Sequence, residues 1–162
     1  MTEHHTYREQ PREEDMDAVG TILKKSGFFN EEEQEVGVSL IAERLQKGEA
    51  SGYFFQFADE GPSLLGYTCF GPIPGTQTSY DLYWIAVDTM FRGRGIGSDL
   101  ISQTEQEIAR RGGTRVYVET SSTKLYNPTR RFYEHCGYMR EAELADYYAP
   151  GDNKCLYVKI LG

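Results

Sequence analysis

One unit of the chain restricts its fold more than any other part: two strand-like segments on either side of a long amphipathic helix. Residues 79–87 (SYDLYWIAV) and 114–120 (TRVYVET) are rich in the aromatic and β-branched residues that favour strands. The helix predicted between them presents an apolar face formed by Ile96, Leu100, Ile101 and Ile108. Because a strand, a helix and a second strand of one sheet are joined by a right-handed crossover, this unit predicts a parallel pair of strands.

The segments around this unit predict antiparallel neighbours for it. Residues 53–58 (YFFQFA) and 64–70 are strand-like, and the turn signal DEGP between them indicates a hairpin. The other predicted elements are a strand at 6–9, helices at 12–25 and 32–46, a short helix opened by Asn127-Pro128, and strands at 138–144 and 155–161. No linker or repeat interrupts the series, so we expect one α/β domain over residues 1–162 with a mixed sheet.

Composition and charge exclude several classes of protein. The formal net charge is −8, whereas proteins that bind nucleic acids or anionic membranes carry a basic surface. No apolar run is long enough to span a membrane, and the first residues contain no apolar stretch typical of a signal peptide. The three cysteines form no C-x-x-C pair, so we predict neither a disulfide framework nor a metal site. A cytoplasmic protein with reduced thiols is the expectation.

A loop rich in glycine and arginine, residues 92–97 (RGRGIG), separates the strand at 79–87 from the amphipathic helix. Glycines let the backbone approach a ligand closely, and the first N–H groups of a helix are unsatisfied and partly positive. With Arg92 and Arg94 beside them, these groups predict a phosphate site. The loop lacks the lysine and hydroxyl of a P-loop, and its glycines are one residue too close for the G-x-G-x-x-G dinucleotide fingerprint. A flexible turn before a helix is the simpler alternative.

Two motifs give the chain a resemblance to a known family. Arg92-x-x-Gly95-x-Gly97 matches the [QR]-x-x-G-x-[GA] motif of the GCN5-related N-acetyltransferases (GNATs), and residues 132–138 (FYEHCGY) match their F-Y-E-x-x-G-[FY] motif. The chain resembles this family over nearly its full length. The resemblance implies a mixed, mostly antiparallel sheet of six to seven strands, splayed between the fourth and fifth, with about four helices. It also implies transfer of an acetyl group from acetyl-CoA, inserted in the splay, to a primary amine of a small molecule or peptide, by direct attack in a ternary complex.

The resemblance also implies which residues hold acetyl-CoA. Backbone groups near Val87 would hydrogen-bond the pantetheine as an added strand does, and N–H groups of residues 92–97 would hold the pyrophosphate. The full cofactor set implied is Ile85, Ala86, Val87, Arg92, Gly93, Arg94, Gly95, Ile96, Gly97, Ser98, Asn127 and Tyr133. Many members of the family carry an asparagine seven residues before the tyrosine, where this chain has Tyr126. Asn127 is therefore either a displaced cofactor contact or only a helix cap.

The chemistry of amide formation assigns further roles under the same resemblance. A phenol stays protonated at neutral pH, so Tyr133 is the candidate acid for the leaving thiolate, with a core aromatic as the alternative. The N–H of Val87 is the candidate donor to the oxyanion. For the base, Asp81 and Glu119 are both candidates, and a chain of waters without a dedicated base is a third possibility.

The acceptor side of the family is formed by segments that match residues 26–33 and 146–154 of this chain. The aromatic residues expected to contact the amine substrate are Phe28, Phe29, Tyr83, Tyr147 and Tyr148. Asp146 and Asp152 could attract an ammonium group. The alternative for the whole set is that these residues belong to surface loops with partly buried aromatic side chains and have no role in binding. The alternative function is a non-catalytic sensor or interaction protein that binds acyl-CoA without turnover. A homodimer is a further possibility, and no nucleic-acid partner is expected.

Overall fold

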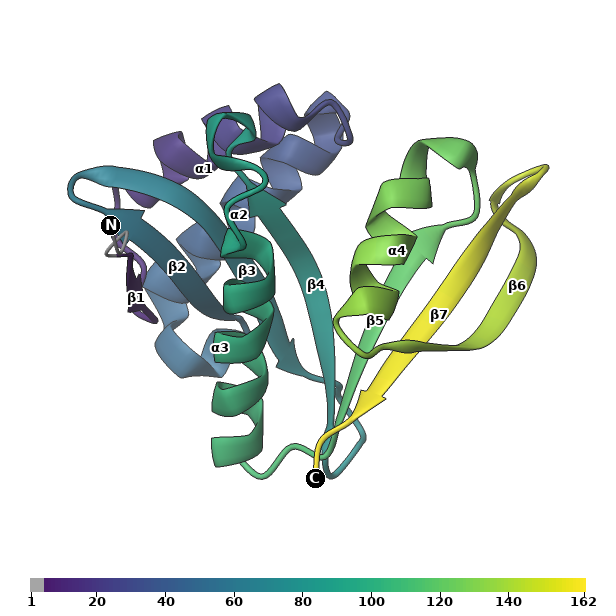
Figure 1. Cartoon of the computed structure of the whole chain (residues 1–162). Helices are drawn as coiled ribbons and strands as arrows, with labels where there is room; N and C mark the ends of the chain where they lie inside the picture. Colours follow the sequence, from purple (N-terminus) through teal and green to yellow (C-terminus); the bar gives the residue numbers. More distant parts are fainter. Residues whose placement is uncertain (1–4) are drawn as a thin grey trace. The chain divides into compact units, whose positions relative to one another are not determined.

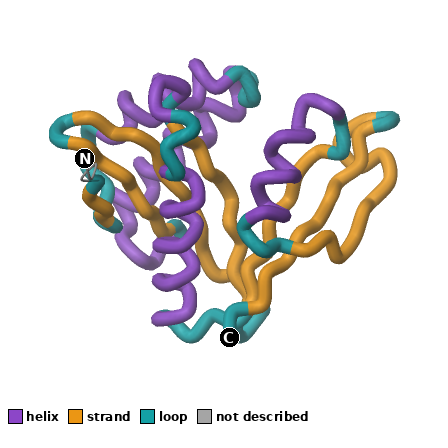
Figure 2. Tube along the Cα trace, viewed as in Figure 1, coloured by secondary structure: helices purple, strands orange, loops and turns teal. Residues whose placement is uncertain are grey.

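The computed structural model describes residues 5–162, so residues 1–4 of the expected domain lie outside the described part. Its elements (Figure 1 and Figure 2) are β1 (Thr6–Arg8), α1 (Asp15–Ser26), α2 (Glu31–Lys47), β2 (Phe54–Glu60), β3 (Ser63–Pro72), β4 (Ser79–Val87), α3 (Ile96–Arg110), β5 (Arg115–Ser121), α4 (Asn127–His135), β6 (Met139–Ala149) and β7 (Asp152–Ile160). The strands hydrogen-bond in the order β1-β2-β3-β4-β5-β7-β6. The β4–β5 pair is parallel, whereas β1–β2, β2–β3, β5–β7 and β6–β7 are antiparallel. The expected mixed, mostly antiparallel α/β fold is confirmed.

The described chain forms two compact units. The first comprises residues up to 71 together with 84–107, and the second comprises 72–83 together with 108–162. β4 begins in the second unit, where Ser79–Asp81 pair with Arg115–Tyr117 of β5, and its last residues belong to the first unit. The candidate residues therefore divide between the units, and each part of the site is described within its own unit.

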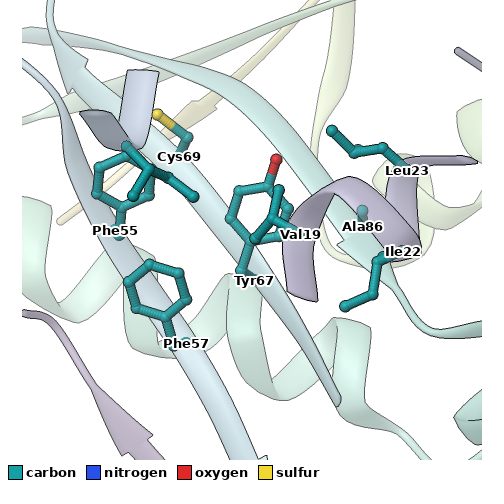
Figure 3. Close-up of a cluster of buried hydrophobic side chains, with 9 residues drawn as sticks. Val19, Ile22, Leu23, Phe55, Phe57, Tyr67, Cys69 and Ala86 are labelled. Atoms are coloured by element: carbon teal, nitrogen blue, oxygen red, sulfur yellow. The ribbon is translucent and has the colours of Figure 1, made fainter. Parts of the chain in front are cut away.

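In the first unit, helices cover both faces of the strands. α1 and α2 lie over an aromatic layer in which Phe55 of β2 is paired with Cys69 of β3, and Phe57 with Tyr67. This buried cluster (Figure 3) consists of Val19, Ile22, Leu23, Ile41, Phe55, Phe57, Tyr67, Cys69 and Ala86. A second cluster joins Ile96 and Leu100 of α3 to Ala58 of β2 and Leu65 of β3, and Ile85 and Val87 pack against it. The end of β4 is thus held by packing on both of its faces, as strand alternation requires.

In the second unit, α4 packs against β7 through Tyr133. The ring of Tyr133 lies 6.0 Å from that of Tyr138 and 6.4 Å from that of Tyr157, between centroids. Arg130, also on α4, donates hydrogen bonds from Nη1 to the carbonyl oxygens of Ser121 (2.5 Å) and Thr123 (3.0 Å), where β5 ends. Aromatic packing and this arginine together fix α4 against β5 and β7.

One predicted helix boundary and one predicted cap are wrong. α1 begins at Asp15 rather than at residue 12, because the Asp15 carboxylate binds Arg8 (2.6 and 2.7 Å) and accepts the N–H of Arg12 (2.6 Å), which holds the preceding residues in a turn. Asn127 is not a helix cap. The chain is already helical before Asn127, because a 3₁₀ turn at Lys124–Tyr126 precedes it. The side-chain oxygen of Asn127 accepts a hydrogen bond from Arg130 and not from a helix N–H.

The hairpin of β6 and β7 is longer than expected from the sequence. The strands were predicted at 138–144 and 155–161, whereas they run over Met139–Ala149 and Asp152–Ile160. Only the Pro150-Gly151 turn remains between them, with Gly151 at φ 82°. Asp146, itself at φ 54°, accepts the N–H of Gly151 at 2.8 Å, which closes this tip. The residues predicted to form an acceptor loop therefore lie mostly on strands.

Three further observations concern the class of protein. Across residues 5–162, every helix is too short or too polar to cross a bilayer. The same residues contain no group of three or more His, Cys, Asp or Glu side chains that could hold a metal ion. The cysteines are free thiols, with Cys69 and Cys155 buried and Cys136 partly exposed.

Candidate functional site

The 92–97 loop is held firmly at both of its ends within the first unit. Asp88, directly after β4, donates its N–H to the carbonyl of Leu65 (2.7 Å) and accepts the N–H of Met90 on its side chain (3.0 Å). At the other end, Ile96 is buried in the α3 cluster. Packing at Ile96 and the hydrogen bonds of Asp88 therefore fix where the first N–H groups of α3 lie.

Between these anchors the loop leaves open space over its glycines. Gly93 and Gly95 have φ values of 82° and 78°, a left-handed conformation that side chains disfavour. A Cβ atom added to either would meet nothing within 4 Å. The loop thus has the properties of a cradle for an anion: exposed backbone, open space and the positive end of a 15-residue helix.

The two arginines of the loop lie against partners that an anion could replace. Arg94 Nη2 is 3.1 Å from Glu60 Oε2, and its guanidinium is 5.3 Å from the Phe91 ring centroid. The Arg92 guanidinium is 6.0 Å from the ring centroid of Phe28, in the connection between α1 and α2. Partly exposed ion pairs such as Arg94–Glu60 contribute at most about 1 kcal/mol, so a phosphate could compete for Arg94. Phe28, one of the expected acceptor contacts, therefore lies near Arg92 of the loop.

Tyr133 lies at the centre of the aromatic cluster of the second unit. Its side chain is 6% exposed and contacts the rings of Phe132, Tyr138 and Tyr157. Burial raises the pKa of its phenol well above the ordinary value of 10, because the charged form is desolvated. The phenol is therefore protonated throughout the physiological range, which is the state that a proton donor requires.

Two acidic residues and a lysine occupy neighbouring strands of the second unit. Asp81 of β4 is in register with Tyr117 of β5, and Glu119 follows two residues later on the same face. Lys154 Nζ of β7 lies 2.9 Å from Glu119 Oε1. The pKa of Asp81 is raised to about 6, first by burial and then by the charge of Glu119, while Lys154 acts in the opposite direction. A carboxyl that titrates near neutral pH can accept and release a proton under physiological conditions.

The aromatic residues expected to contact the acceptor divide between the two units. Phe29 stacks on Trp84 in the first unit, with centroids 5.4 Å apart. In the second, Tyr147 and Tyr148 form an edge-to-face pair at 5.1 Å and are about half exposed, and Tyr83 is also exposed. Asp152 accepts a hydrogen bond from Ser121 Oγ at 2.5 Å, so this carboxylate is engaged within the hairpin.

Comparison with known proteins decides the family. A family model described as "Acetyltransferase (GNAT) family" matches residues 16–138, which include both motifs of the sequence. The chain belongs to the GNAT acetyltransferase family. Among solved structures, a protein of Desulfovibrio desulfuricans assigned to the GNAT family is 38% identical, with a TM-score of 0.97 over 98% of this chain and 100% of that one. No curated protein matches the chain.

More distant GNAT structures share the fold. The ribosomal-protein-S18-alanine N-acetyltransferase of Escherichia coli has 16% identity and a TM-score of 0.77, covering 98% of this chain and 95% of that chain. The PaiA N-acetyltransferase of Thermoplasma acidophilum, solved in complex with coenzyme A, has 15% identity and a TM-score of 0.75, covering 98% and 99%. At these identities the likeness concerns the fold alone.

Two residues of this GNAT chain were missed by the sequence analysis. Arg130 could have been suspected, because it lies three residues after Asn127 and hence on the same side of a helix. Lys154 gave no comparable signal. Its approach to Glu119 depends on the β5–β7 register, in which Ser121 is opposite Lys154, and the sequence does not specify that register.

The raised pKa of Asp81 predicts that Asp81→Asn stabilises the folded protein at pH 8. A carboxyl whose folded-state pKa is raised contributes stability below its unfolded pKa of about 4, and this contribution is lost as the pH rises through about 6. The neutral amide removes the cost of the buried charge. We expect a gain in the free energy of unfolding of roughly 1 kcal/mol at pH 8, reduced because the group is half exposed, and little change at pH 3.

Denaturant unfolding of wild type and variant at both pH values measures this effect. Asp17→Asn is the matched control, because Asp17 is an exposed carboxylate in the first turn of α1, where a negative charge is favourable. Its replacement should slightly lower the free energy of unfolding at pH 8. A loss of stability in Asp81→Asn at pH 8 would contradict the burial of a charged carboxylate at this position.

Proposed function

We propose that this GNAT protein is an N-acetyltransferase that moves the acetyl group of acetyl-CoA to a primary amine of a small molecule or peptide. The observation that carries the proposal is the 92–97 loop, where two left-handed glycines leave open space at the N-terminus of α3. In this proposal, backbone N–H groups of the loop and the side chains of Arg92 and Arg94 hold the pyrophosphate. Ile85, Ala86 and Val87 hold the pantetheine through their backbones, and Ser98 and Asn127 are further contacts of the cofactor.

Bound acetyl-CoA supplies an acetyl group activated as a thioester. For the transfer, the acceptor must lose a proton from its ammonium form, and Asp81 accepts it because its carboxyl titrates close to neutral pH. The N–H of Val87 donates to the carbonyl oxygen as negative charge develops there. The neutral amine attacks the thioester carbon, so that the C–N bond forms and the C–S bond breaks. Tyr133, protonated at neutral pH, donates its proton to the departing sulfur, and the second proton of the nitrogen returns to the Tyr133 oxygen through solvent. The proposed acceptor contacts are Phe28, Phe29, Tyr83, Tyr147 and Tyr148.

The proposed class of acceptor, a primary amine of a small molecule or peptide, is based on the acceptors of structurally similar proteins. The structurally similar proteins include an aminoglycoside 6'-N-acetyltransferase solved with coenzyme A and the N-acetyltransferase of a ribosomal-protein alanine, so the fold accommodates amines of both small molecules and polypeptides. The net charge of −8 favours cationic acceptors, since opposite charge raises association rates. We further propose a cytoplasmic location, and a homodimer that light scattering would detect.

Isothermal titration calorimetry tests which donor the loop binds. We expect acetyl-CoA and CoA to bind with dissociation constants at least about tenfold lower than those of ATP and NAD, because the loop has neither the P-loop nor the dinucleotide spacing. Desulfo-CoA, which lacks the sulfur but keeps the pyrophosphate, should bind about as well as CoA. Preferential binding of NAD would contradict the proposal.

The alternative function is an acyl-CoA sensor that binds without turnover. Both functions predict binding of acetyl-CoA, so binding alone does not separate them. Release of free CoA thiol in the presence of amines does, since a sensor leaves the thioester intact. The pKa of Asp81, raised to about 6, suits a base at neutral pH and favours the enzyme.

A further inference from the structure

The face of the sheet that carries Asp81 holds a set of charges that no single strand supplies. Asp81 belongs to β4, Glu119 to β5 and Lys154 to β7, and all three lie within the second unit. The registers place them on one face: Asp81 is opposite Tyr117, Glu119 follows Tyr117 by two residues, and Lys154 is opposite Ser121. Two carboxylates therefore share a surface with one ammonium group.

The ammonium of Lys154 is held in one place rather than moving freely in solvent. The Lys154 side chain is 13% exposed. Its Nζ lies 2.9 Å from Glu119 Oε1 and 4.4 Å from the ring centroid of Tyr147, so a carboxylate and an aromatic face contact the same charge. Desolvated cation–π contacts of this kind add to the strength of an ion pair. Lys154 is thus held in an ion pair with Glu119.

This pairing makes the two candidate bases unequal. The Glu119 carboxylate is already paired with the Lys154 ammonium. Asp81, on the neighbouring strand, interacts electrostatically with both members of this ion pair. We propose that Lys154 is a positioning residue which, by binding Glu119, leaves Asp81 as the carboxylate that accepts the proton of the amine. The inference rests on the proposed acetyl transfer.

The groups around Asp81 agree with this assignment. Across the sheet, Tyr117 and Glu119 lie on β5 and Lys154 lies on β7, while Tyr83 is on β4 itself. Glu119 raises the pKa of Asp81 and Lys154 lowers it, so the lysine offsets part of the effect of the glutamate. The ion pair therefore keeps Asp81 in the range where a base works at neutral pH.

Charge-changing variants test the proposal through the pKa of Asp81. Carbon-13 NMR of the side-chain carboxyl reports the pKa of Asp81 directly, and the acidic limb of the pH–rate profile reports it independently. Lys154→Met should raise this pKa by about 0.5 to 1 unit, because the charge of Glu119 is then uncompensated. Glu119→Gln should lower it, the double variant should fall between the two single variants, and Lys154→Arg should restore the wild-type value.

Lys159→Met is the matched control for Lys154→Met. It removes an equal charge from β7, but Lys159 lies on the opposite face of the strand, where Nζ donates to the carbonyl of Cys136 at 2.8 Å. The pKa of Asp81 in this variant should equal that in the wild type. An equal shift in both lysine variants, or no shift in Lys154→Met and Glu119→Gln, would overturn the proposal.

The two readouts separate this inference from the function on which it rests. Suppose that amines are acetylated and that the acidic limb of the pH–rate profile is lost in Asp81→Asn but does not shift in the lysine and glutamate variants. The role of Lys154 is then wrong and the proposed function stands. If the NMR titration of Asp81 shifts as expected but no amine is acetylated, the charge coupling is real and the proposed function is wrong.

Discussion

Replacing Gly95 with aspartate should lower the affinity for acetyl-CoA by at least about 100-fold. Gly95 lies at φ 78°, with open space where a side chain would project. An aspartate there would place a carboxylate where the proposed pyrophosphate binds. Two like charges about 4 Å apart repel by on the order of 4 kcal/mol at an effective dielectric constant near 20, more than enough for this loss. Calorimetric titration with acetyl-CoA measures it.

Gly75→Asp provides a control with the same backbone problem. Gly75 lies at φ 82° in the loop after β3, and a Cβ added there also meets nothing within 4 Å. Both variants should lose similar stability, roughly 1 kcal/mol, from the strained conformation. Only Gly95→Asp should lose acetyl-CoA affinity. Equal affinities in the two variants would remove the loop from the binding site.

Tyr133→Phe should lower turnover by about 10- to 1000-fold while acetyl-CoA still binds. The substitution keeps the ring that packs against Tyr138 and Tyr157 and removes only the hydroxyl group. If the phenol protonates the departing sulfur, the lost rate should depend on the leaving group. A thioester with a more acidic thiol should therefore be transferred with a smaller defect. Steady-state rates with the two donors measure this difference.

Tyr138→Phe is the control for Tyr133→Phe. It removes another buried hydroxyl from the same aromatic cluster, so a general effect on packing should appear in both variants. We expect its turnover to stay within about threefold of wild type. Unchanged turnover in Tyr133→Phe, or equal losses in both variants, would assign Tyr133 to the core and not to proton transfer.

The local patterns of the sequence predicted the order of helices and strands and the place of the glycine-arginine loop between β4 and α3. Alternation along residues 79–87 placed Ile85 and Val87 on one face and Ala86 on the other, as the two clusters of the first unit confirm. The glycine-arginine loop and residues 132–138 carried the family, because these motifs are contiguous in the chain. Their roles as individual site residues stay predictions.

The features that the sequence did not reveal depend on contacts between distant segments. Asp15 delays the start of α1 because Arg8, on a strand, binds its carboxylate. The β6–β7 hairpin extends over Tyr147 and Tyr148 because a two-residue turn closes it, and no local signal fixed that length. The pairing of Lys154 with Glu119 follows from the register of β5 and β7 and could not be inferred from spacing along the chain.

The reaction proposed for this GNAT protein is the transfer of an acetyl group from acetyl-CoA to an amine. The most direct measurement follows acetyl-CoA labelled in its acetyl group, incubated with the protein and a panel of primary amines that includes aminoglycosides, polyamines and peptides. We predict label in an N-acetyl amide of at least one amine, with release of an equal amount of free CoA, and none with Gly95→Asp. Tight binding of acetyl-CoA with the label left in the thioester for every amine would contradict the proposed acetyl transfer and favour the sensor.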